Sequence, residues 1–69
     1  MTIYILDYAS GNVVRIHANV QTRKLIEKKY KGDVESYLNE HEKHFGIRMK
    51  DCYFMAVEGE TTILDFNMI

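Results

Sequence analysis

Residues 2–18 read TIYILDYASGNVVRIHA, and this stretch decides the fold that the sequence predicts. Residues 2–8 and 13–18 are rich in β-branched and aromatic side chains, which favour β-strands. The letters ASGN between the two runs are typical of a turn. The stretch therefore predicts two antiparallel strands joined as a β-hairpin.

The length of the turn determines which side chains share a face of this hairpin, because side chains alternate between the two faces of a strand. We expect a three-residue loop, Ala9 to Gly11, with Gly11 in the left-handed conformation. One face then holds Tyr4, Leu6, Tyr8, Val14, Ile16 and Ala18. The other face holds Ile3, Ile5, Asp7, Val13, Arg15 and His17. The first face is the more apolar, so a helix is expected to pack on it.

A second hairpin is predicted over residues 52–67. The segments CYFMAVE (52–58) and TTILDFN (61–67) both have compositions that favour strands. Gly59 and Glu60 between them suit a two-residue turn with glycine in its first central position. This turn would pair the two segments and supply a fourth strand.

A helix is predicted between the hairpins. Asp33 is a favourable N-cap residue, and Gly46 is a typical terminator. Apolar or aromatic side chains recur between them at helical spacing and gather on one side: Val34, Tyr37, Leu38, His41 and Phe45. A shorter helix over residues 22–31 is also expected, with Thr22 as its cap and Gly32 as its stop. A loop with one helical turn is the alternative for that segment.

These elements predict an α+β fold of ββαββ order, in which two β-hairpins flank a central helix. The expected sheet is four-stranded and mainly antiparallel, with the helix on one face. The 69 residues are enough for one small domain, residues 1–69.

Composition narrows the classes of function. Cys52 is the only cysteine, and a single thiol without a recognisable signal peptide is typical of a cytoplasmic protein. A net charge of −1 gives no general attraction to nucleic acid or membranes. No apolar run approaches the length of about 18 residues that indicates a membrane span. No membrane partner is therefore expected.

The most site-like stretch is NEHEKHFG, residues 39–46, where His41 and His44 stand three apart. Such a pair can bind a metal or act in acid–base chemistry, but a metal site needs a third ligand, and the spacing indicates none. A histidine near a helix C-terminus more often packs or interacts with the helix dipole. Cys52 is interpreted as a structural residue, and no catalytic or nucleotide-binding motif is present. We therefore expect no enzyme activity, metal or cofactor.

A basic segment offers a nucleic-acid alternative. RKLIEKKYK, residues 23–31, has five basic residues and one acid, Glu27, so its charge is +4 and the rest of the chain carries −5. The candidate contacts are Arg23, Lys24, Lys28, Lys29 and Lys31. The pI of about 6.3 is far below that of a typical nucleic-acid-binding domain.

The second face of the sheet provides the main functional hypothesis. One helix covers one face, and the residues expected to lie exposed on the other and bind a partner are Ile3, Ile5, Val13, Phe54 and Ile63. The alternative is that residues 19–32 fold across that face and complete the core. The first reading predicts a small non-catalytic protein-interaction module or accessory protein. Its partner would be another protein or a second copy in a homodimer.

Overall fold

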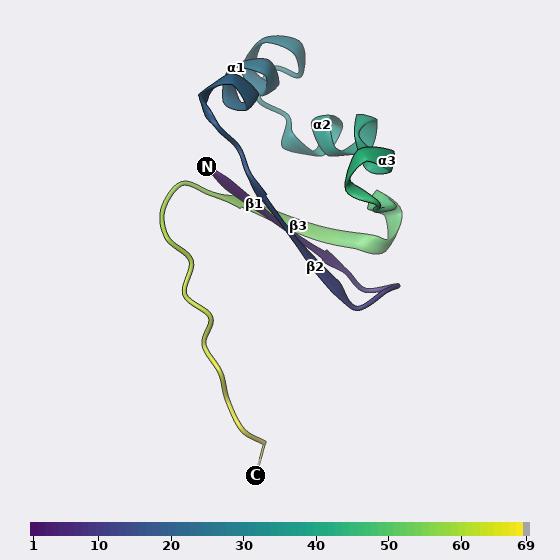
Figure 1. Cartoon of the computed structure of the whole chain (residues 1–69), viewed down its shortest axis with the longest axis vertical. Helices are drawn as coiled ribbons and strands as arrows, with labels where there is room; N and C mark the ends of the chain where they lie inside the picture. Colours follow the sequence, from purple (N-terminus) through teal and green to yellow (C-terminus); the bar gives the residue numbers. More distant parts are fainter. Residues whose placement is uncertain (69) are drawn as a thin grey trace.

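The computed structural model describes residues 1–68 and shows an α+β fold (Figure 1). The strands are β1 (Thr2–Asp7), β2 (Asn12–His17) and β3 (Cys52–Val57). The helices are α1 (Val20–Lys29), α2 (Val34–Glu40) and α3 (Glu42–Phe45), followed by a short 3-10 helix, η1 (Met49–Asp51). The sheet is antiparallel with the order β2-β1-β3, so the first strand is central and the other two form its edges.

The β1–β2 loop has four residues, Tyr8–Gly11, and the predicted three-residue loop is wrong. Asp7 pairs with Asn12, and one carboxylate oxygen of Asp7 accepts hydrogen bonds from the amides of Ala9 (3.1 Å) and Ser10 (3.2 Å). The Gly11 amide donates to the Asp7 carbonyl oxygen at 2.8 Å, and its φ of +78° suits glycine. The Asp7 side chain thus satisfies the loop amides and fixes a register that the apolar pattern does not reveal.

This register changes the composition of both faces of the sheet. Ile3 lies opposite Ile16, and Ile5 lies opposite Val14, so these four aliphatic side chains share a face. Ile3 and Ile5 are fully buried. The prediction that the Tyr4, Leu6 and Tyr8 side receives the helix is therefore wrong. Branched aliphatic side chains pack closely against helices, whereas a buried tyrosine needs a partner for its hydroxyl group.

All the helices lie on the Ile3 and Ile5 side of the sheet (Figure 1). The core joins that face to the helices through one cluster of buried side chains: Ile3, Ile5, Ile26, Tyr30, Tyr37, Leu38 and Ile47. Tyr30, the C-cap of α1, also donates a hydrogen bond from its hydroxyl to the Glu40 carboxylate of α2. The alternative that residues 19–32 fold across the face of Ile3 and Ile5 is therefore correct for these two residues, because Ile26 of α1 packs in the same buried cluster.

The helix caps explain where the helices begin and end. Asp33 is the N-cap of α2, as predicted, and accepts a hydrogen bond from the Ser36 hydroxyl at 2.8 Å. Gly46 ends α3 in the left-handed conformation, also as predicted. The single predicted helix is broken at His41 into α2 and α3. The cap of α1 is Asn19 and not Thr22, because the Asn19 side chain accepts from the Thr22 amide at 2.8 Å.

The predicted four-stranded sheet and second hairpin are wrong. The 61–67 segment forms no strand, and residues 60–68 run in an irregular, extended path away from the sheet (Figure 1). A two-residue turn would require Glu58 to pair with Thr61. Glu58 instead contacts Arg23 at 2.9 Å and the Met1 amino group at 3.9 Å, which hold it toward α1. We call residues 61–68 the tail.

The register can be tested by truncating adjacent β1 side chains on opposite faces. Ile5→Ala removes a fully buried side chain, so we expect the free energy of unfolding to fall by about 2–5 kcal/mol. Leu6→Ala changes a side chain that is 51% exposed, so a loss below about 1 kcal/mol is expected. Urea unfolding followed by circular dichroism measures both. Ile5→Val, with an expected loss of about 0.5–1.5 kcal/mol, serves if the alanine variant does not fold. Equal losses at positions 5 and 6 would contradict the register.

The dependence of the stability on pH provides a second test of these contacts. Hydrogen bonds from Ser10, Ser36 and Tyr30 lower the pKa values of the Asp7, Asp33 and Glu40 carboxyl groups, respectively. A lowered pKa in the folded state stabilises the fold above the unfolded value of about 4. That stabilisation is lost as pH falls through the folded values.

We therefore expect the urea midpoint to decrease as the pH falls below about 4. Asp33→Asn keeps an oxygen that can cap α2 but removes one titrating group, so its midpoint should decrease less over the same range. Identical pH slopes for the variant and the wild-type chain would exclude the Asp33 contribution.

Candidate protein-interaction surface

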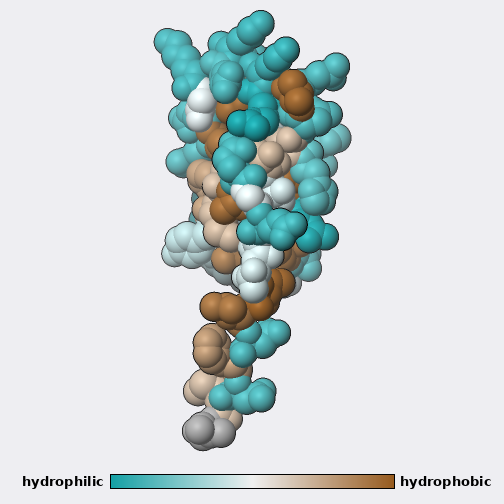
Figure 2. Space-filling view, turned by 90° about the vertical axis from the view of Figure 1, so that its left-hand side faces the viewer, coloured by the Kyte–Doolittle hydropathy of each residue, from teal (hydrophilic) through white to brown (hydrophobic). Residues whose placement is uncertain are grey.

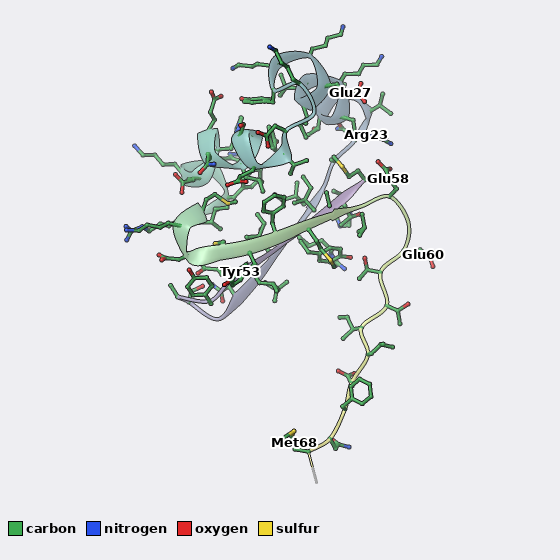
Figure 3. All side chains as sticks on the ribbon, turned by 180° about the vertical axis from the view of Figure 1, so that it is seen from behind. Arg23, Glu27, Tyr53, Glu58, Glu60 and Met68 are labelled. Carbon is green, nitrogen blue, oxygen red and sulfur yellow. The ribbon has the colours of Figure 1, made fainter. Side chains whose placement is uncertain are left out.

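The sheet face opposite the helices is the candidate functional surface, and we call it the open face. The strand register assigns to it Thr2, Tyr4, Leu6, Val13, Arg15, His17, Tyr53, Met55 and Val57. Several of its apolar side chains are strongly exposed, among them Val13 (65%), Tyr53 (71%) and Met55 (48%). Figure 3 shows Tyr53 on the side of the sheet away from the helices. Within residues 1–68, no helix covers this face.

A shallow apolar groove runs between β1 and β3. Its volume is about 250 Å³, and its lining consists of Tyr4, Leu6, Tyr53, Phe54 and Met55. Pockets for drug-sized ligands usually measure about 300–1,000 Å³. The groove is therefore smaller than such pockets.

The open face has few charges. Arg15, which lies opposite Tyr4, is the residue with a permanent charge on this face. The Thr61 hydroxyl, followed by the Arg15 guanidinium, lowers the pKa of the Tyr4 phenol. Thr61 therefore lies beside the open face, and the tail leaves the domain on this side.

The tail exposes a second apolar surface. Ile63, Leu64, Phe66 and Met68 are 80%, 73%, 87% and 98% exposed. Figure 2 shows hydrophobic surface in brown where the tail leaves the domain and mainly hydrophilic surface over the helices. In Figure 3, Met68 lies far from the sheet. No other part of residues 1–68 covers these four side chains.

β3 adds an unpaired backbone edge to these surfaces. It carries the sequence CYFMAV, which contains no charged residue and no proline. Exposed edge strands usually carry charges or prolines that prevent pairing with other chains. The edge of β2, with Asn12, Arg15 and His17, is more polar. β3 is therefore the edge that is less protected against association.

The predicted partner-binding residues lie in different environments. Ile3 and Ile5 are enclosed by the helices and are inaccessible to a partner. Val13 is exposed on the open face, and Ile63 is exposed in the tail. Phe54 lies opposite Ile5 at the sheet edge and is 36% exposed.

Sequence reasoning missed the open-face residues Tyr4, Leu6, Tyr53 and Met55 as candidates. The loop is one residue longer than expected. Each face of β1 therefore shares its side with the other set of β2 side chains. The alternation of side chains was visible in the sequence, but the choice between three and four loop residues depended on the contacts of Asp7.

The basic segment, residues 23–31, covers most of α1 and the start of the turn after it. Two of its five cations have acidic partners, since Arg23 lies 2.9 Å from Glu58 and Lys29 lies 3.7 Å from Glu40. Among the described residues, Lys24, Lys28 and Lys31 make no such ion pair. The segment therefore presents fewer available cations than its sequence suggests.

His41 and His44 have structural contacts. The Nδ1 atom of His41 lies 2.7 Å from the Tyr37 carbonyl oxygen, and its ring packs 4.4 Å from the Tyr37 ring. The His44 ring packs at 5.0 Å against that of Phe45. In the part of the chain that the structure describes, no three His, Cys, Asp or Glu side chains gather as a metal site.

Cys52 is half-buried at the start of β3. Burial raises the pKa of its thiol, and the nearby Asp7 carboxylate raises it further. A raised pKa reduces the fraction of thiolate, which is the nucleophilic form. Its environment therefore favours a structural role.

Another hollow lies beside α3. Its volume is about 570 Å³, and Lys43, Arg48 and Lys50 contribute cationic side chains to its lining. The Glu42 carboxylate, also in the lining, accepts a hydrogen bond from the Met49 amide at 2.6 Å. This contact fixes the turn between α3 and η1. Sequence analysis missed this cationic group because its members are spread over residues 43–50.

Among residues 1–68, the longest helix is α1 with ten residues, and no helix is long and apolar enough to cross a membrane. Comparisons with protein-family models, with curated proteins and with solved structures gave no match to this chain.

Proposed function

We propose that this chain is a small non-catalytic protein-interaction module that binds its partner through the open face. The observation that carries this proposal is the exposed apolar set on one side of the sheet. Tyr53, Met55 and Val13 lie on that side without cover from the helices. Soluble monomers seldom expose a contiguous apolar patch of this kind, and such patches are typical of binding sites.

The chemistry of the open face supports a protein partner. Tyrosine and methionine are enriched at the centres of protein interfaces, where charged residues are depleted. Tyr4, Tyr53 and Met55 line the groove, and Arg15 is the residue with a permanent charge on this face. A partner would therefore be expected to present apolar side chains to the groove and an acidic group to Arg15.

The proposal that the chain is not an enzyme rests on the titratable groups. The candidate acid–base residue His41 is engaged with the Tyr37 backbone, and the pKa of Cys52 is raised. Neither side chain lines the groove. Active sites usually combine a pocket with side chains of suitably tuned pKa.

Nucleic-acid binding through residues 23–31 has less support. Arg23 and Lys29 are neutralised by acids of the same chain, and the pI is about 6.3. Binding through phosphates would be expected to depend on Lys24, Lys28 and Lys31 and to weaken strongly with salt. A charge reversal at Lys28 should therefore weaken nucleic-acid binding and leave protein binding through the open face unchanged.

Leu6→Glu tests the open face directly. The substitution places a carboxylate at the centre of the apolar surface, where its desolvation opposes binding, so we expect the affinity for the partner to fall at least tenfold. The tagged full-length chain is used to isolate partners from its source cells, and each partner is identified by mass spectrometry. The affinity is then measured with purified proteins by calorimetry.

Lys28→Glu on α1 is the matched control and should retain binding. Circular dichroism and the melting temperature establish that both variants are folded. Loss of binding in Lys28→Glu with retention in Leu6→Glu would reject the open face and favour the basic segment.

A further inference from the structure

We infer that the partner of the open face is a second copy of this chain, and that the two copies exchange their tails. In this arrangement, residues 61–68 of each copy lie across the open face of the other. The inference rests on the proposed function, because it names the occupant of the same surface. It follows from three features of the tail: its direction, its pattern and its charge.

The direction of the tail favours another molecule over its own sheet. Thr61 lies beside Tyr4 at the open face, and the residues that follow run away from the sheet on the side without helices (Figure 1). Eight extended residues span about 26 Å, and a six-residue strand spans about 20 Å. The tail is therefore long enough to cross the whole open face of a neighbouring copy.

The pattern of the tail favours burial of one of its sides. Extended side chains alternate, so Leu64, Phe66 and Met68 point to one side, whereas Asp65 and Asn67 point to the other. A segment that lies on one sheet with its outer side in water alternates apolar and polar residues in this way. The side with Leu64, Phe66 and Met68 would therefore pack on the open face of the second copy.

The charges of the two surfaces are complementary. Asp65 is the only charged residue of the tail, and Arg15 is the residue with a permanent charge on the open face. Asp65 is four residues beyond Thr61, which corresponds to about 13 Å of extended chain. Arg15 lies on the edge strand β2, so in the exchanged arrangement its long side chain can reach Asp65 of the second copy at the border of the tail.

The first test is the oligomeric state of the full-length chain. Sedimentation equilibrium across a wide concentration range should show a dimer. Phe66→Asp places a charge in the buried layer, so its dimer dissociation constant should rise at least tenfold. Lys28→Glu adds a negative charge on α1, away from the tail and the open face, and should leave the constant unchanged.

A charge exchange between two chains distinguishes the exchanged dimer from a tail that folds back on its own sheet. Arg15→Asp and Asp65→Arg each create a like-charge contact, so each variant alone should dimerise at least tenfold more weakly. An equal mixture should recover dimers that contain one chain of each kind, because every contact then pairs opposite charges. Native mass spectrometry identifies this mixed dimer by its mass.

Other outcomes would overturn the exchange. A full-length chain that remains a monomer at every concentration would reject it, and the proposed function would then depend on the partner-isolation experiment with Leu6→Glu. A dimer weakened by Leu6→Glu but not by Phe66→Asp would retain the open face and reject the tail. Recovery only when both charge changes stand in one chain would show that the tail covers its own sheet.

Discussion

The structure depends on the position of β1 at the centre of the sheet. This strand is hydrogen-bonded to β2 and β3 on its two edges, so only its two faces can contact elements outside the sheet. One face presents Ile3 and Ile5, which the helices bury completely. A chain of 69 residues supplies few further elements, and its helices all lie on that side. The exposure of Leu6 and the partial exposure of Tyr4 on the opposite face are a direct consequence.

Features of the fold that depend on residues close together in the sequence were predictable. The strands at 2–7 and 12–17 follow from composition, and the Asp33 cap and the Gly46 terminator follow from residue type. The register was not predictable in this way. It depends on one loop residue and on the Asp7 carboxylate, whose hydrogen bonds leave no trace in the apolar pattern.

The sequence predicts that one face of the sheet is left exposed, but it identifies only some of the residues on that face. Packing helices on one side of a small sheet leaves the other side uncovered, and this argument does not require the register. The identity of the exposed residues does require it, so Ile3 and Ile5 were assigned to the surface although they form the core. Residues 61–67 have strand-forming composition, but pairing is a tertiary choice, and the contacts of Glu58 with Arg23 and Met1 direct the chain elsewhere.

The strand order has a further consequence for the path of folding. β1 and β2 are joined by a short loop, so their hairpin can form early and at small entropic cost. β3 joins the opposite edge of β1 only after the helical segments between residues 20 and 51 have been accommodated. During synthesis on the ribosome, this edge of β1 therefore has no strand partner until β3, Cys52–Val57, has emerged. Until then, the backbone N–H and C=O groups on this edge of the hairpin have no strand partner, so the hairpin alone presents an edge that can pair with other chains.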